Sequence, residues 1–139
     1  MLTVAVNRLK RWTRPGLLCI GDAAHAMSPI GGVGVNLAVQ DAVATANLLA
    51  LRLKLEGLPS EDELDAVRRR REFPVKMTQR MQVVVQNNIV NAALKPGNQP
   101  LRVPFVLRLV TAIPWLQGIT ARFVGLGVRP EHVHSASKF

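Results

Sequence analysis

The stretch that most constrains the fold runs from Leu17 to Leu53, where an apolar run, a polar turn and a glycine-rich loop lead into a long amphipathic helix. The run 17–20 lies between Pro15-Gly16 and Gly21-Asp22, which predicts a short strand buried on both faces. Asp22 then falls at the carboxyl end of this strand, where open α/β sheets bind their ligands. The sequence therefore predicts an α/β fold with a ligand crevice directly after the strand.

A long helix is predicted after the glycine-rich loop, from about Val35 onward, because apolar residues recur there at helical spacing. Gly57 and Pro59 supply its stop signal. The positions expected to face the core are Val35, Val39, Ala42, Val43, Ala46, Leu49, Ala50 and Leu53.

The glycine-rich loop and the start of the helix together predict a binding site for electron-rich ligand atoms. Free N–H groups point out of a helix start, which also carries about half a positive charge. The acidic residue upstream, Asp22, does not suit a phosphate but accepts hydrogen bonds from ligand hydroxyls. We therefore expect a polyol chain near Asp22 and an electron-accepting group near residues 34–36, and flavin has both parts.

Residues 21–42, GDAAHAMSPIGGVGVNLAVQDA, resemble the second flavin-binding motif of the FAD-dependent monooxygenases related to para-hydroxybenzoate hydroxylase. The resemblance implies that Asp22 contacts the ribityl chain of the flavin and that Pro29 lies beside the isoalloxazine ring. Residues 31–36 would place backbone N–H groups against the pyrimidine edge of the ring. The implied cofactor-binding residues are Gly21, Asp22, Ala23, Pro29, Gly31, Gly32, Val33, Gly34, Val35 and Asn36.

The same resemblance implies the carboxyl-terminal part of a Rossmann-like FAD-binding domain, with two short strands followed mostly by long helices. The Gly-x-Gly-x-x-Gly loop that holds the ADP half of FAD in this family is absent, since the third position after Gly32-x-Gly34 is Leu37 and the third position after Gly125-x-Gly127 is Pro130, where the motif requires glycine. We therefore expect an incomplete fold that lacks its amino-terminal βαβ unit and belongs with a missing amino-terminal half.

The resemblance implies three parts: residues 1–57 as the second half of the FAD-binding domain, residues 58–134 as the carboxyl-terminal helical part of the same domain, and a tail of residues 135–139. A first strand is predicted within residues 2–9. Ser60 and Glu63 form a predicted capping box for a helix that reaches about residue 91, with a kink or break at Pro74. Two short helices are predicted over residues 103–113 and 114–123.

Several side chains carry alternatives that the sequence leaves open. His25 is interpreted as a loop-bracing residue in preference to a general base, and Asp41 as a helix-stabilising residue or a cofactor contact. The run of arginines at 68–71 is interpreted as a solvated face in preference to a binding patch. On the second long helix an apolar stripe is expected to face the core or to lie against another helix, and not to form a cofactor site; its residues are Met77, Met81, Val84, Val85 and Ile89.

The composition of this chain of 139 residues argues against several classes of partner. Its formal net charge of +9 would attract anions, but aromatic residues make up only 4% and tyrosine is absent, so we expect no nucleic-acid partner. No uninterrupted apolar run reaches the length of a membrane span, and a membrane-surface helix is the less favoured interpretation of residues 103–123. A lone Cys19 and the lack of a secretory signal indicate a cytoplasmic protein, and no metal-ligand pattern is present.

The resemblance implies that the parent protein is an NAD(P)H-dependent flavin monooxygenase that hydroxylates or epoxidises an aromatic or other apolar small molecule with O2. No residue of this chain is predicted to be a catalytic acid or base. The alternatives are an FAD-dependent reductase or dehydrogenase of the same superfamily, such as the geranylgeranyl reductase branch, and a non-catalytic fragment that needs a separate amino-terminal chain.

Overall fold

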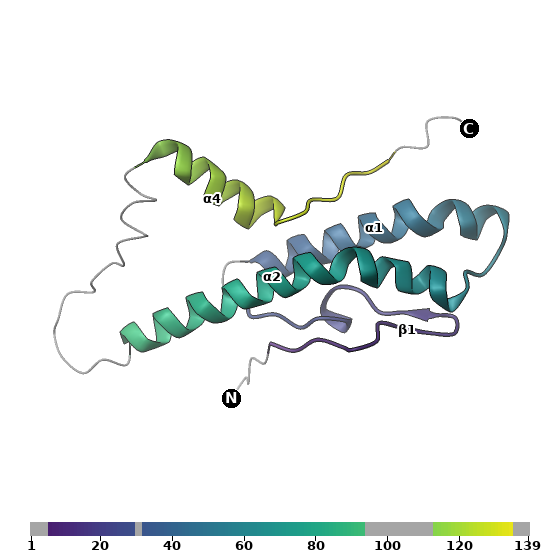
Figure 1. The fold of residues 1–139 in the computed structure, drawn as a ribbon, viewed down its shortest axis with the longest axis horizontal. Coiled ribbons are helices and arrows are strands. Elements are labelled where there is room, and N and C mark those ends of the chain that lie inside the picture. Colours follow the sequence, from purple (N-terminus) through teal and green to yellow (C-terminus); the bar gives the residue numbers. More distant parts are fainter. Residues whose placement is uncertain (1–5, 30–31, 94–112, 135–139) are drawn as a thin grey trace.

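The computed structural model describes residues 6–29, 32–93 and 113–134 of the chain. A hairpin of β1 (Thr13–Arg14) and β2 (Leu17–Leu18) leads into a short 3-10 helix, η1 (Gly21–Ala23), and then into α1 (Val33–Leu55). Helix α2 (Glu61–Ala93) runs back beside α1, and α4 (Pro114–Leu126) precedes the carboxyl-terminal segment. Figure 1 shows α1 and α2 side by side, with the amino-terminal segment and the hairpin lying along α2.

The hairpin pairs Thr13 with Leu18 and Arg14 with Leu17 in antiparallel register. Gly16 adopts a φ of +72° after Pro15, which is the backbone that the third position of a tight turn requires. The strand predicted over 17–20 is shorter than expected, since β2 contains only Leu17 and Leu18. The prediction that it is buried on both faces was wrong, because β2 pairs only with β1 in the described chain and the Leu17 side chain is 53% exposed.

The strand predicted within residues 2–9 is only partly open to comparison, because residues 1–5 lie outside the described chain. Residues 6–9 form no strand. The Asn7 and Leu9 N–H groups donate to the Ala26 and Ala24 carbonyls at 3.1 and 2.8 Å, which ties this segment to the residues after η1.

Helix α1 ends as predicted but buries a different face. The Glu56 N–H bonds the Arg52 carbonyl, and Gly57 follows with a φ of +83°. The expected core positions Val35 and Val39 are 71% and 57% exposed, and Leu53 is 50% exposed. The buried residues of the helix are Leu37, Gln40, Asp41, Ala44 and Leu49, of which only Leu49 was predicted.

Polar chemistry explains this difference. Asp41 turns the buried face toward Arg71 of α2, and a buried carboxylate must keep such a partner. The apolar stripe on the other side of α1 is left exposed. By length and mean hydropathy alone α1 is long and apolar enough to cross a membrane, contrary to the expectation of no such helix, although a soluble core helix passes the same test.

Helix α2 begins with the predicted capping box. The Ser60 N–H donates to Glu63 Oε2 at 2.7 Å, and the Glu63 N–H donates to Ser60 Oγ at 3.3 Å. Pro74 lies inside the helix with its side chain buried and does not split it.

The apolar stripe predicted on α2 is only partly directed inward. Met77 is half-buried, but Met81 and Val84 are 37% and 59% exposed, so the prediction that they face the core was wrong. The side chains of Val85 and Ile89 lie outside the described part, as do residues 103–112 of the helix predicted over 103–113. The helix predicted over 114–123 is α4.

The core lies between the hairpin and the two long helices. One cluster contains Trp12, Ala24, Leu37 and Val75, and a second contains Leu49, Leu64 and Val67. Leu18 of β2 packs against both clusters. The hairpin thereby positions η1, and with it Asp22, against the start of α1.

Candidate functional site

Gly21 sets the distance between η1 and α1. Its φ of +58° lies in the left-handed region, and a Cβ at this position would lie 3.0 Å from the Cβ of Ala38. A side chain at Gly21 would therefore force the two elements apart. The close backbone approach expected at Gly21 is an approach to α1.

Asp22 and the start of α1 face the same space. The Asp22 side chain is exposed, and its Oδ1 lies 4.0 Å from the place that a Cβ on Gly34 would occupy. That Cβ would also lie 3.7 Å from the Cβ of Met27. Both distances are ordinary van der Waals contacts, so Gly34 lies close to the Asp22 carboxylate without a clash. The structure therefore brings together the two residues that the sequence assigned to opposite ends of one ligand.

A backbone hydrogen bond between Gly32 and Pro29 precedes the first turn of α1. The Gly32 N–H donates to the Pro29 carbonyl at 3.2 Å, and Gly32 caps α1 with a φ of +64° and no side-chain hydrogen bond to the helix. First-turn N–H groups have no partner inside a helix, so this end offers donors. Of the ten predicted residues, Asp22, Ala23, Pro29, Gly32, Val35 and Asn36 are exposed, Val33 and Gly34 are half-buried, Gly21 is buried, and Gly31 lies outside the described residues.

These groups fit the chemistry of a flavin. An exposed carboxylate can accept hydrogen bonds from ribityl hydroxyls, and a helix start with no capping side chain can donate to an electron-accepting ring edge. A missing side chain at Gly34 leaves the path between them open. The ten residues remain a prediction for the cofactor contacts.

Directly behind this surface lies a buried polar network around Asp41, which has no exposed side-chain area. Asp41 Oδ2 accepts hydrogen bonds from the Gly21 N–H at 3.0 Å and from His25 Nε2 at 2.5 Å. Asp41 Oδ1 accepts from Arg71 Nε at 2.9 Å. One carboxylate thus holds η1, the following loop and α2 to α1.

The pKa of Asp41 reflects this position. Burial acts to raise the pKa, but the hydrogen bonds from His25 and Arg71, helped by the Gly21 N–H, outweigh burial and hold the pKa below its ordinary value. Asp41 is therefore a buried anion that braces the loop. The helix-dipole interpretation misses this contact, because Asp41 lies in the third turn of α1.

His25 is fully buried against Trp12, with ring centroids 5.2 Å apart, and bonds Asp41 through Nε2. This supports the loop-bracing interpretation of His25 over that of a general base. Trp12 and His25 thus fill the space beneath η1.

The arginine run is a solvated face only in part: the Arg69 side chain is 50% exposed, but the prediction was wrong for Arg71. Arg71 is fully buried and also donates to Gln40 Oε1 and to the Arg129 carbonyl, both at 3.2 Å. Arg70 makes a bidentate pair with the buried carboxylate of Glu131, at 2.7 and 2.8 Å. No local sequence pattern indicates these pairs, since the two partners are 30 and 61 residues apart in the chain.

The carboxyl-terminal segment is fastened to α1 by amide side chains. Gln40 Nε2 donates to the Leu126 carbonyl at 2.6 Å, and Asn47 Nδ2 donates to the His132 carbonyl at 2.8 Å. Together with the Glu131 pair, these bonds close the structure over Arg71. The segment therefore takes part in the same polar network.

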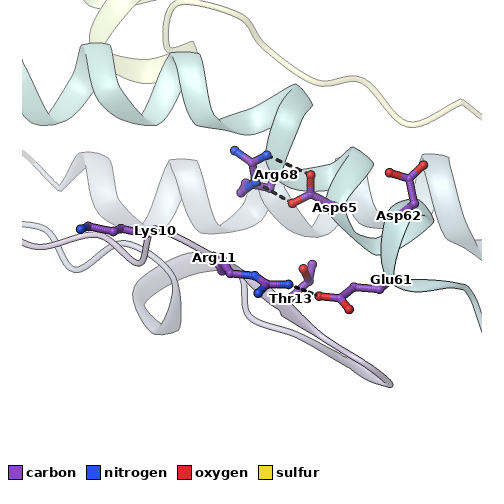
Figure 2. A pocket seen from close by; sticks show the side chains of 7 residues that line it. All are labelled: Lys10, Arg11, Thr13, Glu61, Asp62, Asp65 and Arg68. Atoms are coloured by element: carbon purple, nitrogen blue, oxygen red, sulfur yellow. Dashed lines mark hydrogen bonds and ion pairs between the residues drawn. The ribbon is translucent and has the colours of Figure 1, made fainter.

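A pocket of about 470 Å³ lies away from this surface, between the hairpin and the start of α2 (Figure 2). Its charges neutralise one another, since Arg11 pairs with Glu61 at 2.7 Å and Arg68 pairs with Asp65 at 2.6 Å. These pairs lower the pKa of Asp65, mainly through the hydrogen bonds from Arg68. Its lining therefore serves to dock the amino-terminal segment on α2.

Comparison with known proteins assigns this arrangement to a family. The FAD binding domain family matches residues 1–81, more than half of the chain. The 6-methylpretetramide 4-monooxygenase of Streptomyces rimosus is 44% identical over 101 residues, which are 69% of this chain and 24% of that protein.

Two fungal relatives match shorter stretches. The FAD-dependent monooxygenase dpchE of Colletotrichum higginsianum is 42% identical over 50% of this chain and 15% of its own length. The FAD-dependent monooxygenase atmM of Aspergillus flavus is 31% identical over 63% of this chain and 18% of its own length. The matches span about a quarter or less of these relatives. The chain belongs to the FAD binding domain family, and its resemblance to FAD-dependent monooxygenases is confirmed.

Proposed function

We propose that this chain supplies the part of an FAD site that holds the ribityl chain and the pyrimidine edge of the flavin, within an NAD(P)H-dependent monooxygenase. The observation that carries the proposal is the exposed Asp22 carboxylate facing the start of α1 across Gly34. The names of the relatives support an aromatic or other apolar small molecule and O2 as the co-substrates of the whole protein.

Each group has one task in this proposal. Asp22 accepts hydrogen bonds from ribityl hydroxyls, and the backbone N–H groups at 34–36 stabilise negative charge at the ring edge. FAD, when bound, supplies the redox chemistry. Asp41 and His25 act through Gly21 to hold Asp22 at its distance from the helix.

We further propose that the rest of a longer flavoprotein covers the exposed face of α1. Val35, Val39 and Leu53 on this face are each at least half exposed, whereas the buried residues of α1 lie on the side toward α2. Contiguous exposed apolar surface of this kind marks an interface. The relatives are several times longer than the matched region, so they contain additional chain that could supply such a cover.

Flavin affinity tests the proposal. FMN, which carries the ribityl chain and ring without the adenosine, is titrated into the chain at moderate salt while its fluorescence is followed. We expect Asp22→Ala to weaken binding by about tenfold or more, because a hydrogen bond to a charged acceptor contributes about 1.5–3 kcal/mol.

The matched control is Asp62→Ala, which removes the same charge from a side chain that is 85% exposed and away from η1. This variant should bind FMN as the unmodified chain does. Equal weakening in both variants, or none in Asp22→Ala, would count against the assignment of Asp22.

A further inference from the structure

A second pocket, of about 610 Å³, lies against residues 76–84 in the middle of α2, and its lining residues are not part of the proposed flavin site. Five of its lining residues, Lys76, Gln79, Arg80, Val83 and Val84, recur at three- and four-residue intervals on α2 and so share one face of the helix. Arg8 faces them from the amino-terminal segment. The volume lies in the range of small-molecule sites.

Arg8 is fixed in this pocket without losing its charge. Arg8 Nη1 donates to Gln79 Oε1 at 2.8 Å, and Gln79 Nε2 donates to the Asn7 and Ala26 carbonyls at 2.9 and 3.3 Å. The Gln79 amide, only 7% exposed, is therefore held on both sides. A neutral acceptor orients the guanidinium without a direct ion pair, and the charge of Arg8 acts on Glu72 only at a distance, as one of the smaller causes that lower the pKa of Glu72.

The carboxylates nearby are committed elsewhere. Glu72, one turn before Lys76, pairs through Oε1 with Lys76 at 2.5 Å and through Oε2 with Arg68 at 2.7 Å. Among the residues that the structure describes, neither Arg8 nor Arg80 pairs with a carboxylate. The described lining of this pocket thus contains three cationic side chains and no acidic one.

An apolar wall completes the pocket. Val83 and Val84 are 41% and 59% exposed there, at a position where the sequence pattern of α2 predicts burial for Val84. A ligand that pairs with the two arginines can therefore also cover apolar surface. Free inorganic anions would use only the first of these two features.

We propose that this pocket binds a small organic anion, a carboxylate or phosphate ester attached to an apolar body, with Arg8 and Arg80 holding the anionic group and Val83 and Val84 the apolar part. The pocket lies beside the loop that leads to α1, because Gln79 and Gln82 bond the carbonyls of Ala26 and Ser28. This proposal does not depend on flavin binding.

The test uses the full chain, with two-dimensional NMR to follow the backbone amides during titration. The probes are benzoate, phenyl phosphate, inorganic phosphate and the neutral benzyl alcohol. We expect benzoate or phenyl phosphate to shift the amides of residues 79–84 saturably, and the stronger of the two identifies the head group. Inorganic phosphate and benzyl alcohol should each bind more weakly, because each uses only half of the pocket.

Two substitutions with matched controls decide the outcome. Arg80→Gln should weaken binding of the preferred probe by about tenfold, as expected for one charge-assisted hydrogen bond. Arg14→Gln, which removes an exposed arginine from the hairpin turn, should not change it. Val84→Ser should weaken binding, and Val133→Ser, at a side chain that is 74% exposed, should not.

The proposal is overturned if no probe binds saturably. It is also overturned if Arg14→Gln weakens binding as much as Arg80→Gln, because the attraction is then due to net charge. Equal binding of inorganic phosphate and phenyl phosphate would equally refute it, since the apolar wall would contribute nothing.

Discussion

Replacing Asp41 with alanine should destabilise the chain more than any exposed acidic substitution. The change removes the acceptor for the Gly21 N–H, His25 and Arg71 at once. Arg71 has no exposed side-chain area, and its remaining partners are the Gln40 amide, the Arg129 carbonyl and Glu131 at 3.8 Å. Its charge would thus stay buried with its main partner gone.

Removing one member of a buried ion pair costs about 3–5 kcal/mol. The net stability of a domain is about 5–15 kcal/mol, so this one change removes a large fraction of it. Asp41→Asn should cost less but still destabilise, because all three partners of Asp41 donate hydrogen bonds and the amide nitrogen must meet at least one of them.

Urea unfolding followed by Trp12 fluorescence measures the effect, with Trp115→Phe as the background so that only the buried tryptophan reports. Asp62→Ala serves as the exposed control and should change the free energy of unfolding by less than about 1 kcal/mol. In the double variant Asp41→Leu/Arg71→Met, only part of the stability should return, since an apolar pair can replace the buried ion pair while the Gly21 N–H and His25 still lose their acceptor. A loss below about 1 kcal/mol for Asp41→Ala would refute the bracing role of this network.

Three further predictions concern pH, packing and the open face of α1. Pairing keeps the pKa of Asp41 below its ordinary value of 3.8, and pairing with Arg70 keeps the pKa of Glu131 below its ordinary value of 4.5, so in acid the unfolded chain binds more protons than the folded chain. The free energy of unfolding should therefore be constant above about pH 5 and fall below about pH 4. A urea midpoint that stays unchanged down to about pH 3 would contradict this. Gly21→Ala should lower the free energy of unfolding by about 2 kcal/mol or more, because the new Cβ adds a clash with Ala38 to the strain of a left-handed backbone. The control, Gly16→Ala, carries the backbone strain alone and should cost less. Equal losses in the two variants by urea unfolding would show that η1 and α1 are not in close contact. Without a cover on the exposed face of α1, the chain should self-associate through that face. Val39→Glu with Leu53→Glu should then reduce self-association in analytical ultracentrifugation while helix content by circular dichroism is kept, whereas loss of helix content would show that this face is packed within the chain.

Local signals predicted the ends of the elements well. The capping box at Ser60 and Glu63, the stop at Gly57 and the turn at Pro15-Gly16 all form as their residue types require. Each depends on backbone preferences that act within a few residues. They therefore hold whatever the rest of the chain does.

The faces of the helices could not be predicted in the same way. On α1 the apolar stripe would go inward if hydrophobicity alone decided, but Asp41 meets Arg71 and the polar face is buried instead. Such a choice depends on a partner 30 residues away. The exposed stripe on α1 also reads as core in the sequence, because a surface that another segment covers has the composition of a core.

The sequence motif assigned residues to the candidate site, but the buried residue that holds them in position was not predicted. Residues Asp22 and Gly34 follow from the motif, and the structure places them together. The buried anion behind them, Asp41, looked like an ordinary helix residue, since no local pattern distinguishes a carboxylate that accepts three bonds from one that faces water.

The central claim is that Asp22 and the start of α1 form one half of a flavin site. The most direct measurement is an NMR titration of the isotope-labelled chain with riboflavin, compared with lumiflavin, which has the ring without the ribityl chain. Riboflavin should shift the amides of Asp22 and of residues 33–36 together, and lumiflavin should shift the helix start while leaving Asp22 largely unchanged. Shifts confined to other parts of the chain, or identical shifts at Asp22 with both flavins, would contradict the claim.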